Sequence, residues 1–104
     1  MKEVNFMTIN KLDFKYVASI ALDNIDAVLS AWISDGKHQG HEYVALNPTR
    51  SDQSSGSFSV NTNTGKWSDF ATGDKGGDLV SLVAYIDGIN QGEACTSLAA
   101  LSRH

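Results

Sequence analysis

The first third of the chain carries apolar residues at spacings of three and four, which predicts helix with one buried face. This stripe consists of Phe14, Val17, Ala18, Ala21, Ile25, Val28, Leu29 and Trp32. Asp23-Asn24-Ile25-Asp26 places capping residues within the run, so it can divide the run into two helices near residue 23. Gly36 ends the helical part. Residues 1–36 are therefore predicted to be helical, with the stripe packed in the core.

The middle of the chain has the short apolar stretches that are typical of strands. Residues 41–46 are bounded by Gly40 and by Asn47-Pro48, and residues 57–60 alternate, so that Phe58 and Val60 share one face. Residues 61–65 combine Asn, Thr and Gly, which favours a turn, and residues 66–70 then form the returning strand of a hairpin. The polar residues 49–56 are predicted to form an exposed loop.

The last part of the chain predicts two further helices. Asp78, after Gly76-Gly77, is placed to cap a helix whose apolar positions are Leu79, Leu82, Val83 and Ile86. Asn90 and Glu93 have the spacing of a capping box. The helix that they begin turns Ala94, Leu98 and Leu101 inward, and Cys95 is expected there as a small buried side chain.

Composition narrows the possible classes of protein. The chain has 104 residues, 41% hydrophobic and 19% charged, which fits one globular domain over residues 1–104 and argues against general disorder. A single cysteine makes neither an internal disulfide nor a cysteine-based zinc site, and a reducing, cytoplasmic location fits it best. The N-terminus has no long apolar run, so neither a signal peptide nor a membrane span is expected.

The net charge of −4 counts against strong, sequence-independent binding to DNA, because nucleic-acid-binding domains are usually basic. No segment is positive: residues 41–75, for example, carry three basic and four acidic side chains. Any DNA-binding site would have to arise from folding that gathers a few cations on one face.

A set of motifs in the second half of the chain resembles a known family. Asn47-Pro48-Thr49-Arg50, the Ser57-Phe58-Ser59-Val60 segment and residues 67–78, which end in Gly76-Gly77-Asp78, are similar to the zinc-ribbon domain of bacterial and phage DNA primases. The likeness runs from about residue 41 to about residue 101. It is greatest to the cysteine-less N-terminal segment of phage and plasmid primase-helicase proteins. The resemblance implies an α+β fold: a small antiparallel sheet, zinc-ribbon-like, packed against an N-terminal helix and two C-terminal helices.

The resemblance also identifies four positions where the family holds its metal. They correspond to Asn47 and Arg50 in the first turn and to Phe70 and Gly73 in the second, and none of the four residues is a usual zinc ligand. His38 and His41 have the wrong spacing to replace them. We therefore expect neither bound zinc nor another cofactor. We further expect Phe70 to fill the former metal site with an apolar side chain, and the N-terminal helix to supply the remaining stability.

Four residues are candidates for contact with single-stranded DNA: Arg50, Lys66, Trp67 and Lys75. Aromatic rings on a sheet with cations nearby can stack bases. Strand alternation puts Trp67 and Phe70 on opposite faces, so at most one of them is available. Phe70 is the one expected in the core. For Trp67, burial in the core and exposure on the surface are both consistent with the sequence. Arg50 can contact a phosphate or, as we favour, form a salt bridge to Asp69 or Asp74. Residues 73–78 are interpreted as a turn and helix cap rather than a phosphate-binding loop, because Asp74 and Asp78 would repel an anion.

The sequence therefore predicts a non-catalytic module that engages single-stranded template DNA weakly or positions a primase or helicase domain, in cis or in trans. The alternative is a protein-docking module that does not bind DNA. A free-standing enzyme is disfavoured because no set of paired catalytic groups is evident, and in the resembled family the polymerising acids lie in a separate domain.

Overall fold

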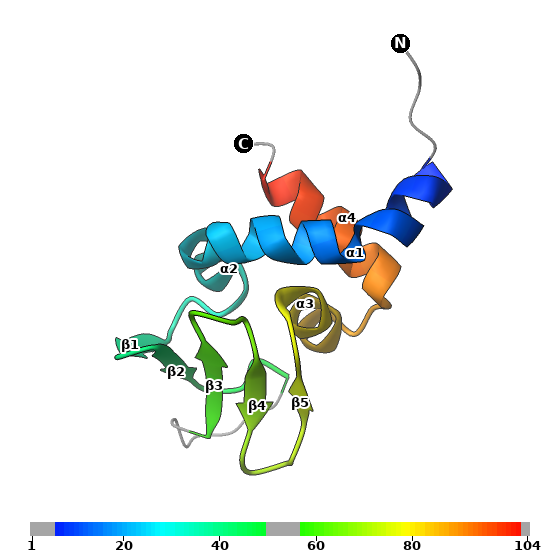
Figure 1. The fold of residues 1–104 in the computed structure, drawn as a ribbon. Coiled ribbons are helices and arrows are strands. Elements are labelled where there is room, and N and C mark those ends of the chain that lie inside the picture. Colours follow the sequence, from blue (N-terminus) through cyan, green and yellow to red (C-terminus); the bar gives the residue numbers. More distant parts are fainter. Residues whose placement is uncertain (1–5, 50–56, 103–104) are drawn as a thin grey trace.

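The computed structural model describes residues 6–49 and 57–102, which form an α+β fold of four helices and a five-stranded antiparallel sheet (Figure 1). In chain order the elements are α1 (Phe6–Asp23), α2 (Ile25–Trp32), β1 (Lys37–Gln39), β2 (Glu42–Ala45), β3 (Phe58–Asn61), β4 (Trp67–Asp69), β5 (Lys75–Gly76), α3 (Leu79–Asp87) and α4 (Gln91–Ser102). The helices gather on one side of the molecule and the sheet on the other (Figure 1).

The sheet is a simple meander in which each strand pairs with its neighbour in sequence, in the order β1-β2-β3-β4-β5. Directly opposed residues point to the same face, so the register defines rows of side chains across the sheet. One row is His38, Tyr43, Val60, Trp67 and Gly76, on the inner face. The next row is Lys37, Val44, Ser59, Ser68 and Lys75, on the outer face.

The core lies between the inner face of the sheet and the helices. The sheet contributes Tyr43, Ala45, Phe58, Val60 and Trp67, all buried. The helices and the residues that directly follow or flank them contribute Ala21, Val28, Leu29, Ile33, Leu79, Val80, Leu82, Val83, Ala94, Cys95 and Leu98. The expected burial of Cys95 is thus confirmed, and the N-terminal helical part does supply core side chains. Phe14 is an exception to its stripe, because its side chain is partly exposed.

The helix ends follow the predicted chemistry. The α1–α2 run divides at Asn24, whose side-chain amide donates to the Ile20 carbonyl at 2.9 Å. Asp78 caps α3 by accepting from the Ser81 amide at 2.8 Å. Asn90 and Glu93 exchange two hydrogen bonds at the start of α4, at 2.8 and 3.1 Å, as a capping box does. Local capping signals therefore predicted the starts of α3 and α4 correctly. The division near residue 23 is confirmed as well, although the Asn24 side chain makes no capping hydrogen bond to α2.

The two edge strands, β1 and β5, were not expected from the sequence. β1 is the polar segment Lys37-His38-Gln39, and all three of its residues are exposed, so no apolar alternation marks it. β5 has only two residues. Both strands form through backbone pairing, β1 with β2 and β5 with β4, and such pairing leaves no signal in the hydrophobic pattern.

Among the described residues, no helix is long and apolar enough to cross a membrane.

Candidate functional site

Two turns that follow strands β2 and β4 are joined by a network of hydrogen bonds. Asn47 and Asp69 are almost completely buried, at 1% and 0% exposed. Nδ2 of Asn47 donates to Oδ2 of Asp69 at 2.7 Å and to the Tyr85 hydroxyl at 2.8 Å. The Tyr85 hydroxyl in turn donates to Oδ2 of Asp74 at 2.8 Å. We call Asn47, Asp69, Asp74 and Tyr85 the polar clamp.

The polar clamp also fixes the backbone of both turns. Oδ1 of Asn47 accepts from the backbone amide and the hydroxyl of Thr49, at 2.8 and 2.7 Å. Oδ1 of Asp69 accepts from the Ala71 amide at 2.8 Å, and its backbone carbonyl accepts from the Gly73 amide at 2.8 Å. Buried polar groups are tolerated only when they are hydrogen-bonded, and Asn47 and Asp69 meet that condition by holding the two turns together.

Tyr85 connects the polar clamp to the core. Its ring centre lies 4.6 Å from that of Trp67 and 6.4 Å from that of Phe58. The indole nitrogen of Trp67 donates to the Ser81 hydroxyl at 3.0 Å, within α3. The ring of Tyr85 therefore packs among buried aromatic side chains while its hydroxyl reaches the turns.

The expectation that Phe70 fills the former metal site is wrong, because its side chain is 78% exposed. The alternation of β4 turns Asp69 inward and Phe70 outward, and the buried position is taken by the Asp69 carboxylate in the polar clamp. The Phe70 amide donates to the carbonyl of Ser57 at 2.8 Å, which ties the start of the turn to the residue that precedes β3. Gly73 lies in the same turn with φ of +83°, a conformation that glycine adopts readily.

The assignment of Trp67 as a DNA-stacking residue is also corrected. Its side chain is 5% exposed and faces the core. Stacking a base on it would require unpacking Tyr85 and Phe58. The two rings do lie on opposite faces, as strand alternation predicted, but the exposed ring is that of Phe70.

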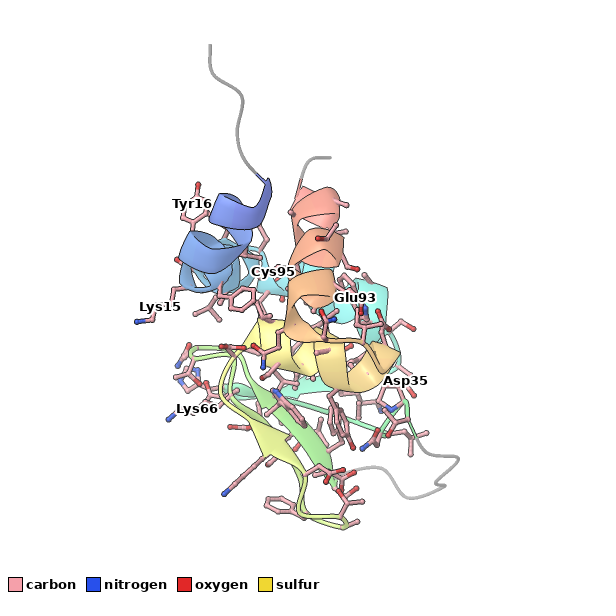
Figure 2. The ribbon with its side chains drawn as sticks, turned by 90° about the vertical axis from the view of Figure 1, so that its right-hand side faces the viewer. Lys15, Tyr16, Asp35, Lys66, Glu93 and Cys95 are labelled. Carbon is pink, nitrogen blue, oxygen red and sulfur yellow. The ribbon has the colours of Figure 1, made fainter. Side chains whose placement is uncertain are left out.

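The outer face of the sheet gathers cations that are scattered in sequence. Lys37 and Lys75 stand at the two ends of the outer row, on opposite edges of the sheet. Four strand spacings of about 4.8 Å separate those edges by about 19 Å. Lys66 precedes β4 and is exposed, and Figure 2 shows it pointing away from the helices. Small side chains, Ser59 and Ser68, lie between the lysines.

The structure thus brings Lys66 and Lys75 to the outer face and adds Lys37, which sequence reasoning missed because β1 was not predicted. Glu42 is the acidic side chain that the described strands place on this face, and it accepts from Nδ2 of Asn61 at 3.5 Å.

Arg50 lies outside the described residues, so the structure tests neither its predicted phosphate contact nor its predicted salt bridge. Tyr85 was also missed, because its hydroxyl contacts Asp74 and Asn47, which are 11 and 38 residues away in the sequence.

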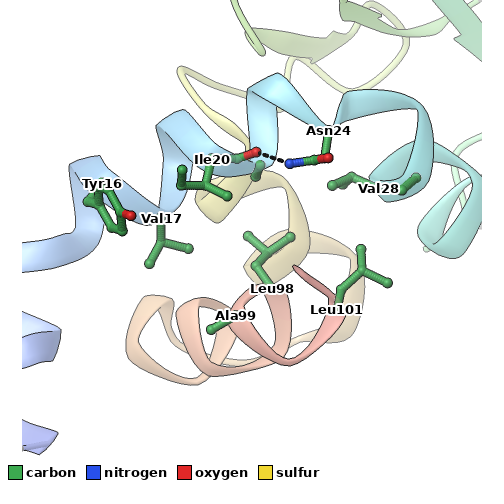
Figure 3. A pocket seen from close by; sticks show the side chains of 10 residues that line it. Tyr16, Val17, Ile20, Asn24, Val28, Leu98, Ala99 and Leu101 are labelled. Carbon is green, nitrogen blue, oxygen red and sulfur yellow. Dashed lines mark hydrogen bonds between the residues drawn. The ribbon is translucent and has the colours of Figure 1, made fainter. Parts of the chain in front are cut away.

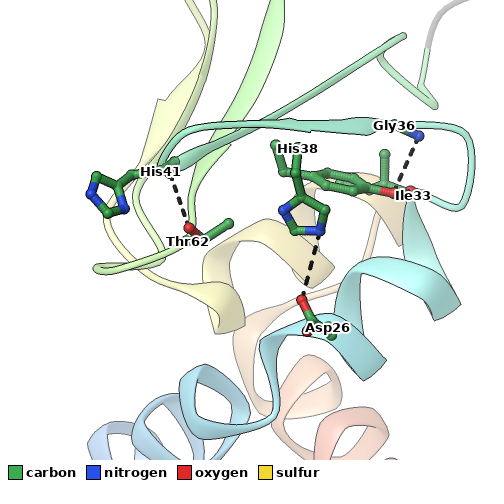
Figure 4. A network of polar contacts seen from close by, with 7 residues as sticks. Asp26, Ile33, Gly36, His38, His41 and Thr62 are labelled. Atoms are coloured by element: carbon green, nitrogen blue, oxygen red, sulfur yellow. Dashed lines mark hydrogen bonds and ion pairs between the residues drawn. The ribbon is translucent and has the colours of Figure 1, made fainter.

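The positions that the resemblance matches to metal ligands have other surroundings in this structure. The side-chain amide of Asn47 donates within the polar clamp, Phe70 points outward, Gly73 has no side chain, and Arg50 lies outside the described residues. In the part of the chain that the structure describes, no three His, Cys, Asp or Glu side chains come together as a metal site would require. His38 lies against the Tyr43 ring with Nε2 3.7 Å from Asp26 Oδ1, whereas the His41 carbonyl accepts from Thr62, so the two histidines make separate contacts (Figure 4).

A second surface feature is an apolar groove of about 460 Å³ between α1, α2 and α4 (Figure 3). It is lined by Tyr16, Val17, Ile20, Ala21, Asn24, Ala27, Val28, Leu98, Ala99 and Leu101. Tyr16, at its rim, is 62% exposed. The groove is formed by the helices and is separate from the outer face of the sheet.

Comparison with known proteins does not assign the chain to a family. No protein-family model matches it, and no curated protein matches its sequence significantly.

Proposed function

We propose that this chain is a non-catalytic module that binds single-stranded DNA on the outer face of its sheet, and that it serves a primase or helicase domain as the resembled primase modules do. The observation that carries the proposal is the combination of three exposed lysines, Lys37, Lys66 and Lys75, with the exposed ring of Phe70 in the turn that follows β4. Cations and an exposed aromatic ring on one sheet face are what a single strand requires.

Each part of this face has a physical role in the proposal. The lysines neutralise phosphates and release the counterions that surround the strand. Phe70 offers a π-face for a base, and base–aromatic stacking is worth about 1–3 kcal/mol. The side chains of Ser59 and Ser68, in the middle of the face, are small, so a DNA strand can approach the backbone of the sheet there. The net charge of −4 opposes this attraction, and the affinity is therefore weak and sensitive to salt.

The acidic residues near the face support a binding role rather than phosphoryl transfer. Asp69 is buried and accepts from Asn47 and Ala71. Asp74 accepts the Tyr85 hydroxyl. Two-metal catalysis needs carboxylates that converge on open space, whereas these two carboxylates hold the turns.

The second candidate, a protein-docking module, has its own observation in the groove between α1, α2 and α4. An apolar groove of this size, with an exposed Tyr16 at its rim, is typical of a surface that receives an apolar partner. The lack of any positive segment in the sequence agrees with this alternative.

Fluorescence anisotropy with a labelled oligothymidine at low salt separates the two functions. We expect measurable binding that Phe70→Ala weakens about 5- to 150-fold, the equivalent of about 1–3 kcal/mol of stacking. Tyr16→Ala is the matched control, since it removes an exposed ring that lies on α1, and it should leave the affinity unchanged. Absence of binding at low salt would contradict the proposal and favour the docking module.

A further inference from the structure

The turn that carries Phe70 is fixed at both ends. At its start, the Phe70 amide donates to Ser57, and the Asp69 carboxylate accepts from Ala71. At its end, the Asp74 carbonyl accepts the Asp69 amide at 2.8 Å, and the Asp74 side chain accepts the Tyr85 hydroxyl at 2.8 Å. An exposed aromatic residue is thus presented by a turn whose backbone has many internal partners.

This arrangement has a consequence for binding. A ring on a pre-ordered turn loses less conformational freedom when a base stacks on it, so more of the stacking energy appears as affinity. Because Asp74 closes the turn, whatever holds the Asp74 side chain also sets the position of Phe70.

The Tyr85 hydroxyl is the group in the best position to do this. It lies between the two turns, accepting from Asn47 and donating to Asp74, while the ring below it packs against Trp67. Ring and hydroxyl have separable roles: the ring contributes to the core, and the hydroxyl contributes to the turns.

We infer that Tyr85 is a positioning residue for DNA binding, and that its hydroxyl holds the 70–74 turn so that Phe70 can stack a base. This inference rests on the proposed function and adds to it a residue that does not itself contact the strand. In this role the Tyr85 hydroxyl adds a second connection between the two turns, beside the direct hydrogen bond from Asn47 to Asp69.

The experiment compares two single-stranded probes, an oligothymidine and an abasic strand of the same length, which carries phosphates without bases. Tyr85→Phe removes the hydrogen bonds to both Asn47 and Asp74, and the one to Asp74 is the one that holds the 70–74 turn. Losing that bond should weaken binding of the oligothymidine about three- to ten-fold and leave binding of the abasic strand unchanged. In a Phe70→Ala background the further effect of Tyr85→Phe should vanish, because the hydroxyl acts through Phe70. An equal loss with both probes, or the same loss without Phe70, would overturn the inference.

Tyr43→Phe is the matched control. Like the Tyr85 hydroxyl, the Tyr43 hydroxyl has two hydrogen-bond partners. They are the backbone amide of Gly36 and the backbone carbonyl of Ile33, which belong to the segment between α2 and β1 and not to the 70–74 turn. This variant should lower stability by a similar amount without changing the affinity for either probe. A loss of oligothymidine binding equal to that of Tyr85→Phe would assign the effect to general stability and overturn the inference.

Binding of the two probes by the wild-type protein separates a failure of the proposed function from a failure of this inference. If it binds neither probe, DNA binding is contradicted, and amide hydrogen exchange then tests the positioning role alone. Faster exchange at Ala71 and Gly73 in Tyr85→Phe, with unchanged exchange in the core of α3, supports control of the turn by the hydroxyl. Unchanged exchange at these amides overturns it.

Discussion

At the scale of single residues, the buried polar pair of Asn47 and Asp69 has the strictest requirement for hydrogen-bond partners. A carboxylate removed from water is costly unless its oxygens have partners, and Asn47 and Ala71 each provide one. Asn47 is well suited to its position, because it has two amide hydrogens for Asp69 and Tyr85 and an oxygen for Thr49. No single smaller side chain satisfies all three neighbours.

Replacing Asn47 should therefore destabilise the fold. Asn47→Ala removes the donor to Asp69 and leaves a buried carboxylate oxygen without that partner, which should cost about 1–3 kcal/mol in the free energy of unfolding. Asn63→Ala, in the exposed turn between β3 and β4, is the matched control, and it should change stability by less than about 0.5 kcal/mol. Urea unfolding followed by circular dichroism measures both, and equal effects of the two variants would show that the polar clamp contributes nothing.

Sequence reasoning singled out positions 47 and 70, but it was wrong about Phe70, whose side chain is exposed, and it gave Asn47 no structural role. The family spacing placed both in the two turns, yet spacing alone does not say which residue of a turn points inward. Asp69 faces the core, whereas Phe70, the next residue and the one that the resemblance matches to a metal ligand, does not. The partner that decides this, Tyr85, is 38 residues from Asn47, and no local pattern reveals such a contact.

At the scale of elements, helix caps and turns could be predicted from the sequence, whereas the pairing of the edge strands could not. The caps at Asp78 and Asn90 and the turn that ends with Gly65, at φ of +81°, follow from the preferences of residues close together in the chain. Strands β1 and β5 depend instead on neighbours that supply hydrogen bonds. β5 is so short that its place next to β4 needs a close approach at Gly76, over which the Trp67 indole lies.

Adjacent glycines allow that close approach to be tested. A Cβ at Gly76 would lie 2.5 Å from both Trp67 Nε1 and Ser81 Oγ, so Gly76→Ala should force β5 away from β4 and cost about 1–3 kcal/mol. A Cβ at Gly77 would meet nothing within 4 Å, so Gly77→Ala should be nearly neutral. Thermal unfolding, with near-ultraviolet circular dichroism as a reporter of Trp67 packing, distinguishes them. A neutral Gly76→Ala would show that β5 is not held in this position.

At the scale of the whole molecule, folding separates charges that the sequence mixes. The net charge of −4 describes the chain, whereas the outer face of the sheet carries Lys37, Lys66 and Lys75. Total charge sets the average field around the molecule, and the local arrangement sets the contacts that a bound strand makes. The sequence could not predict this face, because Lys37 reaches it only through the pairing of β1 with β2.

The salt dependence of DNA binding measures how many of these lysines act together. Each phosphate neutralised on a single strand contributes about 0.7 to the slope of log affinity against log salt, so three lysines should give a slope of about −2. Lys37→Ala should reduce the steepness by about 0.7, and the triple variant should bring the slope close to zero. Lys15→Ala is the control, because Lys15 is an exposed lysine on α1 rather than on the sheet (Figure 2). An equal change in slope for Lys15→Ala would mean that the strand responds to overall charge and that the outer face is not the binding surface.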